Sequence, residues 1–227
     1  MQINSHHLTS SPRHQRRIIL FTVCYLLFAI CHLGCAKREI KNIDSKGKAI
    51  ICFGDSLTFG YGANPGEDYP TALSKMTNIP VFNAGIDGDT TVEALKRLDS
   101  DIFYRDPLLV IIEFAGNDFL KKIPPEVTMN NIRTMVDKIQ ANGAMVAIVD
   151  ISAGVLLGEY YKVFYKMARE KNAIFIPRLL SGIITNPNLK SDFIHPNAEG
   201  YRMIAQKIFQ VITPYLQENS RVKNPQK

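Results

Sequence analysis

Three short runs of purely apolar residues constrain the fold of this chain more than any other feature of the sequence. They are Ala49–Phe53, Leu108–Ile112 and Ala144–Val149, and a segment with helical spacing or helix-capping residues follows each of them. Runs of this length without polar alternation are typical of strands that are buried on both faces. Strands of this kind that alternate with helices predict a parallel sheet covered by helices on both sides.

The remaining segments complete this alternation. Two helices are expected to begin near Asp68 and at Thr90. Three more are expected at Glu126–Ala141, Glu159–Lys171 and Asn197–Leu216. The two further strands are Val81–Phe82 and Ala173–Ile176. Thr90 and Glu93 have the spacing of a capping box, in which each side chain satisfies a free backbone N–H group. We therefore expect one α/β domain at residues 49–216, a three-layer α/β/α sandwich with a central parallel sheet, followed by a polar, frayed tail at residues 217–227.

The first 36 residues have the composition of a targeting segment. Three arginines lie between positions 13 and 17, and residues 18–36 carry no charge. A basic flank followed by an apolar run is typical of a secretory signal. A run of about nineteen apolar residues is also just long enough to span a bilayer. Residues 1–36 are therefore predicted to be a signal sequence or membrane anchor, and the polar residues 37–48 are predicted to be a linker.

The end of this segment, Leu33-Gly34-Cys35, resembles the end of a bacterial lipoprotein signal, in which the cysteine becomes the lipidated first residue. Such signals have leucine three residues before the cysteine, and this sequence has His32 there. The alternatives are an uncleaved anchor, with its amino end held in the cytoplasm by the arginines, and a simple cleaved signal. All three place the domain in the bacterial cell envelope on the periplasmic side, and a membrane-attached lipoprotein is the favoured interpretation.

Charge and cysteine content exclude two classes of protein. The net charge of +6 includes the three leader arginines, and without them 24 basic residues face 21 acidic ones, a net charge of +3. The chain has no Lys/Arg run either, so we expect no nucleic-acid partner. Three of the four cysteines lie in the leader, and Cys52 alone remains in the domain. One cysteine cannot form a disulfide within the domain, which excludes a disulfide scaffold.

Small polar residues follow the first two predicted strands, where ligands bind in a parallel sheet. Ser56 lies in Gly54-Asp55-Ser56-Leu57, directly after the first strand. A serine on a tight turn between strand and helix can present its hydroxyl as a nucleophile, and it can equally be part of an ordinary helix cap. The second strand is followed by Asn83–Thr90, where two glycines permit the close approach of a ligand or simply form a flexible loop.

Two further motifs follow later strands. Asn117, in Gly116-Asn117-Asp118, can aim its amide at a developing negative charge or serve as a turn residue. His195 follows Asp192 by three residues, and the carboxylate can fix the histidine tautomer and leave Nε2 free as a base. A structural histidine is the alternative. Together with Ser56, these residues supply a nucleophile, a base, an orienting acid and an oxyanion donor, which are the groups that acyl transfer needs.

These motifs resemble the four sequence blocks of the GDSL, or SGNH, hydrolase family over about residues 48–216. The similarity is greatest to the bacterial branch that contains a periplasmic thioesterase/lysophospholipase and arylesterases. The resemblance implies a flavodoxin-like sandwich, no metal and no organic cofactor. It also implies that Ser56, His195 and Asp192 are catalytic, and that the oxyanion is held by the N–H groups of Ser56 and Gly88 and the amide of Asn117. The chain departs from that branch at Ala115, where a glycine is common.

The resemblance further implies that the loop Ser152–Gly158 borders the acyl pocket. Its residues Val155, Leu156 and Leu157 are apolar, and the chain has no tryptophan for stacking on sugars. We therefore expect an acyl-ester or lipid-like small-molecule substrate, such as a lysophospholipid, an aryl ester or an acyl thioester. The alternatives are an O-acetylesterase of cell-envelope glycans and a non-catalytic binding lipoprotein. Asp55 and Asp118 are expected to hold the loops rather than to act in catalysis.

Overall fold

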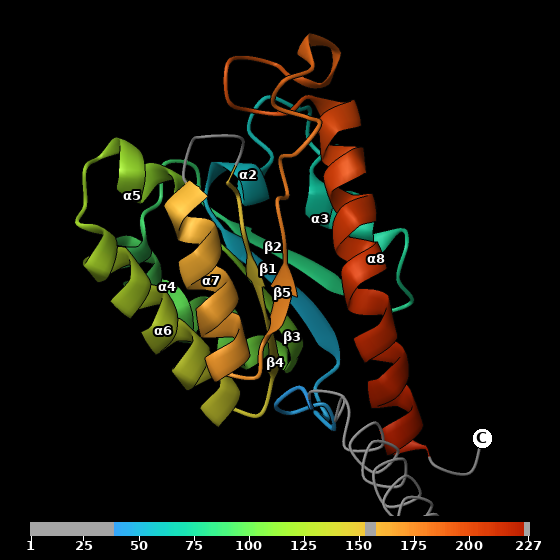
Figure 1. Ribbon diagram of the computed structural model, residues 1–227. Helices are drawn as coiled ribbons and strands as arrows, with labels where there is room; N and C mark the ends of the chain where they lie inside the picture. The colour runs from blue at the N-terminus through green and yellow to red at the C-terminus, as the bar shows by residue number, and fades with distance from the viewer. Residues whose placement is uncertain (1–38, 153–157, 225–227) are drawn as a thin grey trace, which may run out of the picture. The chain divides into compact units, whose positions relative to one another are not determined.

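The computed structural model describes residues 39–152 and 158–224, and its centre is a sheet of five parallel strands in the order β2-β1-β3-β4-β5 (Figure 1). The strands are β1 (Ala49–Gly54), β2 (Val81–Gly85), β3 (Pro107–Glu113), β4 (Met145–Val149) and β5 (Ile174–Ile176). This is the flavodoxin-like order, and it confirms the predicted parallel sheet. The chain runs from β1 to β2, which lies beside one edge of β1, and then to β3, which lies beside the other edge of β1. Loops that follow β1 and β3 therefore diverge and leave a crevice at the carboxyl ends of the strands.

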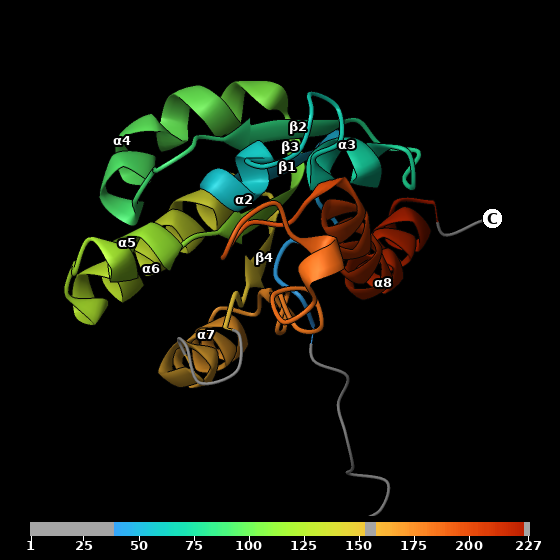
Figure 2. The ribbon, with the colours of Figure 1, turned by 90° about the horizontal axis from the view of Figure 1, so that it is seen from above.

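Helices cover both faces of this sheet, as expected for a three-layer sandwich. The described helices are α2 (Ser56–Phe59), α3 (Tyr69–Ser74), α4 (Thr91–Ile102), α5 (Gly116–Leu120), α6 (Pro125–Ala141), α7 (Gly158–Glu170) and α8 (Ala198–Lys223), and 3₁₀ turns form at Phe103–Arg105 and Pro187–Leu189. Helices α3 and α8 lie on one face, and α4, α6 and α7 lie on the other (Figures 1 and 2). The short helices α2 and α5 lie at the carboxyl end of the sheet, directly after β1 and β3.

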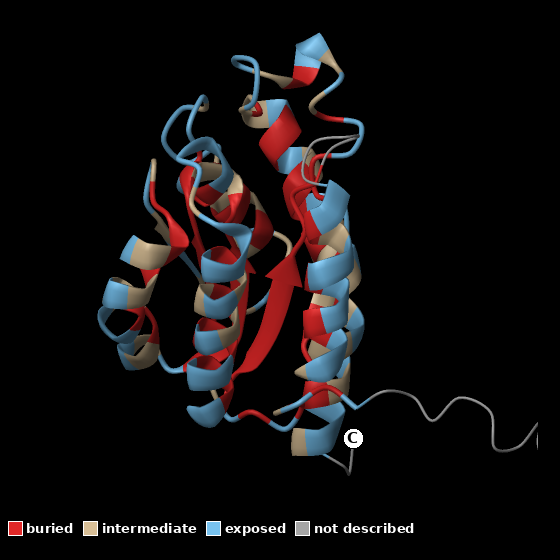
Figure 3. Cartoon of the chain, turned by 60° about the vertical axis from the view of Figure 1, so that its left-hand side comes forward, coloured by how far each residue is buried: buried red, intermediate tan, exposed pale blue. Residues whose placement is uncertain are grey.

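The strands divide the hydrophobic core into two halves. Ile50 and Cys52 of β1 pack on the side of α3 and α8, whereas Ile51 and Phe53 pack on the side of α4, α6 and α7. Every residue of β1, β3 and β4 is buried. Figure 3 shows the same contrast, with buried strands and with helices that expose their outer faces. Burial on both faces is the physical reason why these strands appear as continuous apolar runs in the sequence.

The compact unit begins at Glu39 and therefore includes most of the segment predicted to be a linker. Ile40 and Ile43 are buried in the core on the α8 side. The side-chain amide of Asn42 donates to the backbone oxygens of Gln140 and Ala144 at 2.8 and 2.9 Å. Residues 39–48 are thus packed on the domain, because two isoleucines among the polar residues have a place in its core.

Helix α8 likewise extends beyond the predicted end of the domain at Leu216 and reaches Lys223. Asn219 is buried, and its amide donates to the backbone oxygens of Ile43 and Ser45 at 2.7 and 3.0 Å. This contact fixes the last turns of the helix to the amino-terminal segment. The predicted frayed tail is therefore ordered helix up to Lys223, for a reason that local composition does not reveal.

The leader, Cys35 and the apolar residues Val155, Leu156 and Leu157 lie outside the described residues. The expectations for them remain predictions. None of the helices that the structure describes is long and apolar enough to cross a membrane.

Ala115 has an unusual backbone conformation at the start of α5. Its φ is +109°, in the region that favours glycine, and its side chain is buried. A non-glycine residue held in this way costs on the order of 1–3 kcal/mol. The position at which the sequence departs from the family pattern is therefore one where the backbone conformation itself favours glycine.

Candidate active site

Ser56 lies at the first turn of α2, one residue after the end of the interior strand β1. Asp55 caps this helix, since its Oδ1 accepts a hydrogen bond from the backbone N–H of Leu57 at 3.2 Å. Gly60 then ends the helix with a φ of +95°. The turn is tight because a single residue separates the end of the strand from the start of the helix. The serine is thereby held at the carboxyl end of the sheet.

His195 reaches Ser56 from the loop that precedes α8. Its Nε2 lies 3.1 Å from Ser56 Oγ, although the two residues are 139 positions apart in the sequence. Its Nδ1 lies 2.8 Å from Asp192 Oδ2. The ring also lies against the ring of Tyr61, with 4.5 Å between the ring centroids. The structure therefore brings the predicted serine, histidine and aspartate into one hydrogen-bonded row.

Asp192 is held as an anion by its neighbours. Its Oδ1 accepts the backbone N–H groups of Ile194 and His195, each at 2.8 Å. Partial desolvation acts to raise its pKa, but the hydrogen bonds from the His195 ring and from these two N–H groups lower the pKa to about 2. The carboxylate thus remains charged at neutral pH, and its two oxygens have different, fixed partners.

The predicted oxyanion donors come from the loops after β2 and β3. Asn117 lies in the first turn of α5, and its Nδ2 donates to the backbone oxygen of Asp89 at 3.0 Å. Gly88 precedes Asp89, has a φ of +73° and accepts a hydrogen bond from Lys121 Nζ at 2.8 Å. The two predicted donors are therefore linked through the residue beside Gly88. Gly85 has a different role, since a side chain there would clash with the backbone of α2.

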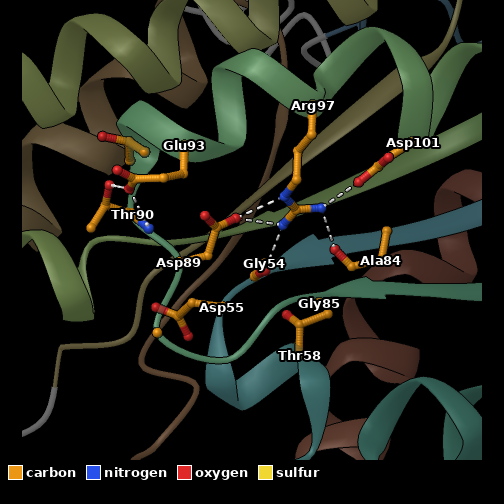
Figure 4. A network of polar contacts seen from close by, with 12 residues as sticks. Gly54, Asp55, Thr58, Ala84, Gly85, Asp89, Thr90, Glu93, Arg97 and Asp101 are labelled. Atoms are coloured by element: carbon orange, nitrogen blue, oxygen red, sulfur yellow. Dashed lines mark hydrogen bonds and ion pairs between the residues drawn. The ribbon is translucent and has the colours of Figure 1, made fainter.

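Arg97 of α4 connects the turn that carries Ser56 to this second loop (Figure 4). Its guanidinium donates to the backbone oxygens of Gly54 and Ala84 at 3.1 and 2.9 Å. It also pairs with Asp89 and Asp101, each at 2.7 Å, and lies over the ring of Phe53. One side chain thus connects the ends of β1 and β2 with the loop that carries Gly88.

Replacing Arg97 by methionine is expected to lower the free energy of unfolding by about 3 kcal/mol. The Asp89 side chain is only 4% exposed, and removing its partner leaves a buried charge without compensation. Urea unfolding of the two proteins measures the difference. The matched control is Arg133→Met, which breaks an exposed pair with Glu170 and should cost at most about 1 kcal/mol. Equal small losses of unfolding free energy in both variants would contradict the role of Arg97 as the partner of the buried Asp89 charge.

Asp118 and Asp55, the two aspartates expected to hold loops, are both buried and hydrogen-bonded to neighbouring segments. Asp118 is buried and accepts hydrogen bonds from the backbone N–H and hydroxyl of Thr91 and from the hydroxyl of Thr128. It thereby joins α5 to α4 and α6. Asp55 is buried and caps α2. Neither has the contact with His195 that Asp192 has.

A cavity of about 340 Å³ opens beside Ser56 and His195. Asn117 also lines it, and the apolar part of its wall consists of Leu57, Phe119, Leu120, Ile151, Leu180, Ile184 and Ile194. The sequence patterns did not indicate this wall. Its residues lie in α2, in α5 and in the segments that follow β4 and β5, with no common periodicity, and only their position after strands or beside His195 could have indicated them. Among the described residues, no group of three or more His, Cys, Asp or Glu side chains could hold a metal ion.

Comparison with known proteins gives consistent matches. The model of the GDSL-like Lipase/Acylhydrolase family matches residues 52–203. An arylesterase of Vibrio mimicus is 30% identical over 178 residues, which cover 74% of this chain and 89% of that protein. The thioesterase 1/protease 1/lysophospholipase L1 of Escherichia coli K12 is 26% identical over 179 residues, covering 75% and 86%. The solved structure of esterase EstA from Pseudoalteromonas sp., inhibited by monoethylphosphonate, has a TM-score of 0.67 at 28% identity and covers 75% of this chain and 99% of its own.

One further relative bears on the leader. A Bacillus subtilis (strain 168) protein named uncharacterized lipoprotein YqeF is 29% identical over 123 residues, which cover 50% of this chain and 47% of that protein.

Proposed function

This chain belongs to the GDSL-like lipase/acylhydrolase family and is a carboxylic-ester hydrolase, and we propose that Ser56, His195 and Asp192 carry out its reaction. The single observation that supports this assignment most is the hydrogen-bonded row from Ser56 Oγ through the imidazole to Asp192. A nucleophile, a base within hydrogen-bond reach and a group that orients the base are the parts of a serine hydrolase.

The proposed reaction has two halves. Ser56 Oγ attacks the ester carbonyl carbon while His195 Nε2 takes the hydroxyl proton, and the same proton then leaves with the alcohol or thiol. Water attacks the resulting acyl-enzyme with His195 again as base, and the acid is released. Asp192 stays ionised throughout, since its low pKa keeps the proton on the imidazole, and its charge stabilises the imidazolium.

The negative oxygen of each tetrahedral intermediate needs hydrogen-bond donors, and we assign them to the N–H groups of Ser56 and Gly88 and the amide of Asn117. The contact of Asn117 with Asp89 O supports this role, because it holds the amide in a fixed place in the lining of the cavity. Removing one donor of this kind costs on the order of 10²–10³ in kcat.

The apolar wall of the cavity supports a medium-length acyl chain as the substrate group. Seven aliphatic or aromatic side chains line it, and its volume of about 340 Å³ is at the small end of the range for ligand sites. Burial of each methylene of the chain contributes about 0.8 kcal/mol to binding. An acetyl group would leave most of this wall uncovered. We therefore favour acyl esters or thioesters, including lysophospholipids and aryl esters, over acetylated glycans.

Hydrolysis of p-nitrophenyl esters from acetyl to palmitoyl tests this substrate class. We expect kcat/KM to peak at medium chain lengths, and Ile184→Trp, which fills the cavity, to move the peak to shorter chains. The control is Val163→Trp, on the exposed face of α7, which should leave the profile unchanged. A peak at acetyl in the unaltered protein would reject the acyl-chain assignment and favour the O-acetylesterase alternative.

We also propose that the protein is exported and attached to the cell-envelope membrane through its leader. The uncharged run at residues 18–36 and the similarity to a protein named a lipoprotein support this proposal. Bacteria grown with labelled palmitate should label the protein, and Cys35→Ser should abolish the label. Label that persists in this variant would rule out lipidation at Cys35.

A further inference from the structure

Glu113 is a wholly buried carboxyl group that lies beneath the turn carrying Ser56. It is the last residue of β3 and pairs across the sheet with Gly54, two residues before the serine. Its Oε2 accepts a hydrogen bond from the hydroxyl of Thr58 at 2.8 Å, and the backbone N–H groups of Asp55 and Thr58 also act on the carboxyl. Glu113 therefore contacts the chain on both sides of Ser56.

The turn is folded closely around this carboxyl. A Cβ atom on Gly54 would lie 2.7 Å from Glu113 Oε2 and would also collide with the hydroxyl of Thr58. The space that a side chain at position 54 would need is thus filled by Glu113 and its partner. Glycine therefore fits at this position, where the Thr58 hydroxyl and both the backbone oxygen and the carboxyl of Glu113 approach closely.

The second carboxyl oxygen of Glu113, Oε1, bears on whether this carboxyl is protonated. Among the side chains that the structure describes, Oε1 is the one buried nitrogen or oxygen atom without an N–H or hydroxyl donor. The carboxyl of Asp55 acts on Glu113 as a nearby charge, and a side-chain hydrogen bond with Glu113 acts to lower the pKa of Asp55 against the effect of burial. Two carboxyl groups can form a hydrogen bond only when one of them carries a proton.

The surrounding charges favour this shared proton. The ionisable groups that act most on the two carboxyls, apart from each other, are acids: Asp118 and Asp89 act on Asp55. Arg97 donates to Gly54 O but directs its charge at Asp89 and Asp101. The other groups that face Glu113, from β1, α3 and α8, are weak acids that are neutral at pH 7, namely Cys52, Tyr69 and Tyr201.

We propose that Glu113 is a positioning residue that keeps its proton at neutral pH and donates it to Asp55, so that the pair holds the Ser56 turn in its reactive geometry. Burial raises the pKa of Glu113 well above its usual value, and burial also raises that of Asp55 to about 7. Above neutral pH the pair is therefore a neutral acid bonded to a carboxylate. Asp55 can then accept both the N–H of Leu57 and the proton of Glu113.

Glu113→Gln tests the proton directly, because the amide supplies the same donor and cannot ionise. We expect the infrared spectrum of the unaltered protein to contain the carbonyl band of a protonated carboxyl at about pH 9, where ordinary carboxyls are ionised. Glu113→Gln should lack this band, and the exposed control Glu159→Gln should retain it. The absence of the band in the unaltered protein would overturn the proposal.

Stability gives a second readout that does not involve catalysis. The unfolded chain releases the Glu113 proton near the usual pKa of 4.5, whereas the folded protein keeps it, so the unaltered protein loses stability as the pH rises above that value. Glu113→Gln escapes this loss. Its stability relative to the unaltered protein should therefore increase from pH 5 to about pH 9. A constant or decreasing difference would mean that Glu113 is ionised.

The kinetic readout rests on the proposed nucleophile. Glu113→Gln should keep kcat within about threefold, whereas Glu113→Leu, which removes both hydrogen bonds, should lower kcat about 10- to 100-fold with little change in KM. Equal losses of kcat in both variants would overturn the positioning role. If Glu113→Leu does not fold, the kcat of Glu113→Gln decides, and a loss well beyond threefold would overturn the role. If Ser56 were not the nucleophile, the infrared and stability readouts would still give their expected results.

Discussion

The variant Ser56→Ala is expected to hydrolyse p-nitrophenyl esters on the order of 10⁶-fold more slowly than the unaltered protein. The alanine removes the only atom that forms the acyl bond in the proposed mechanism, Ser56 Oγ, which lies 3.1 Å from His195 Nε2. The fold should persist, because the helix cap of α2 is formed by Asp55 and its contact with Leu57, not by the serine hydroxyl. Substrate should still bind, since the cavity wall is unaltered.

Steady-state kinetics on the full chain in detergent measures this loss, and a thermal melt shows whether the fold is retained. The matched control is Ser220→Ala, on the exposed side of α8, where the hydroxyl contacts only the backbone oxygen of Leu216. It should keep full activity. If the folded Ser56→Ala protein turned over at more than about one hundredth of the normal rate, another residue would have to be the nucleophile.

The sequence was sufficient to predict the layers of the fold and the residues that come together at the candidate site. Burial on both faces makes β3 a continuous apolar run, and the predicted strand at Leu108–Ile112 falls within the observed Pro107–Glu113. The capping box at Thr90 and Glu93 marks the start of α4 for a similarly local reason. Ser56 and His195 could be found because turn residues after buried strands meet at one end of a parallel sheet.

Features that depend on contacts between distant segments could not be predicted in this way. The cavity wall joins Leu180 and Ile184 to residues of α5, and no local pattern marks the two as partners. The last turns of α8 are held by Asn219 through its contact with residues 43–45. Glu113 ends an apolar strand and looks in the sequence like the first exposed polar residue after it. Only the structure places its carboxyl inside the nucleophile turn.

Replacing Asp192 by asparagine is expected to lower kcat about 10⁴-fold at neutral pH. The reason is that each carboxylate oxygen of Asp192 has its own hydrogen-bond partners. Oδ1 accepts two backbone N–H groups at 2.8 Å, so the amide oxygen of an asparagine must take that place. The amide NH₂ then faces His195 Nδ1, which must be unprotonated to accept from it. The imidazole proton is thereby moved to Nε2, where it prevents the ring from taking the proton of Ser56.

The two variants at position 192 should differ in an unusual order. Asp192→Ala removes the charge but imposes no tautomer on the ring, so at neutral pH it should retain more activity than Asp192→Asn, although asparagine is closer in shape to aspartate. Steady-state kcat for the two variants decides the matter, with thermal melts to show that both are folded. Nitrogen chemical shifts of His195 provide a direct measure of the tautomer, which should have its proton on Nδ1 in the unaltered protein and on Nε2 in Asp192→Asn. If asparagine were the milder change, Asp192 would act mainly through its charge, and its two backbone contacts would have no part in setting the tautomer.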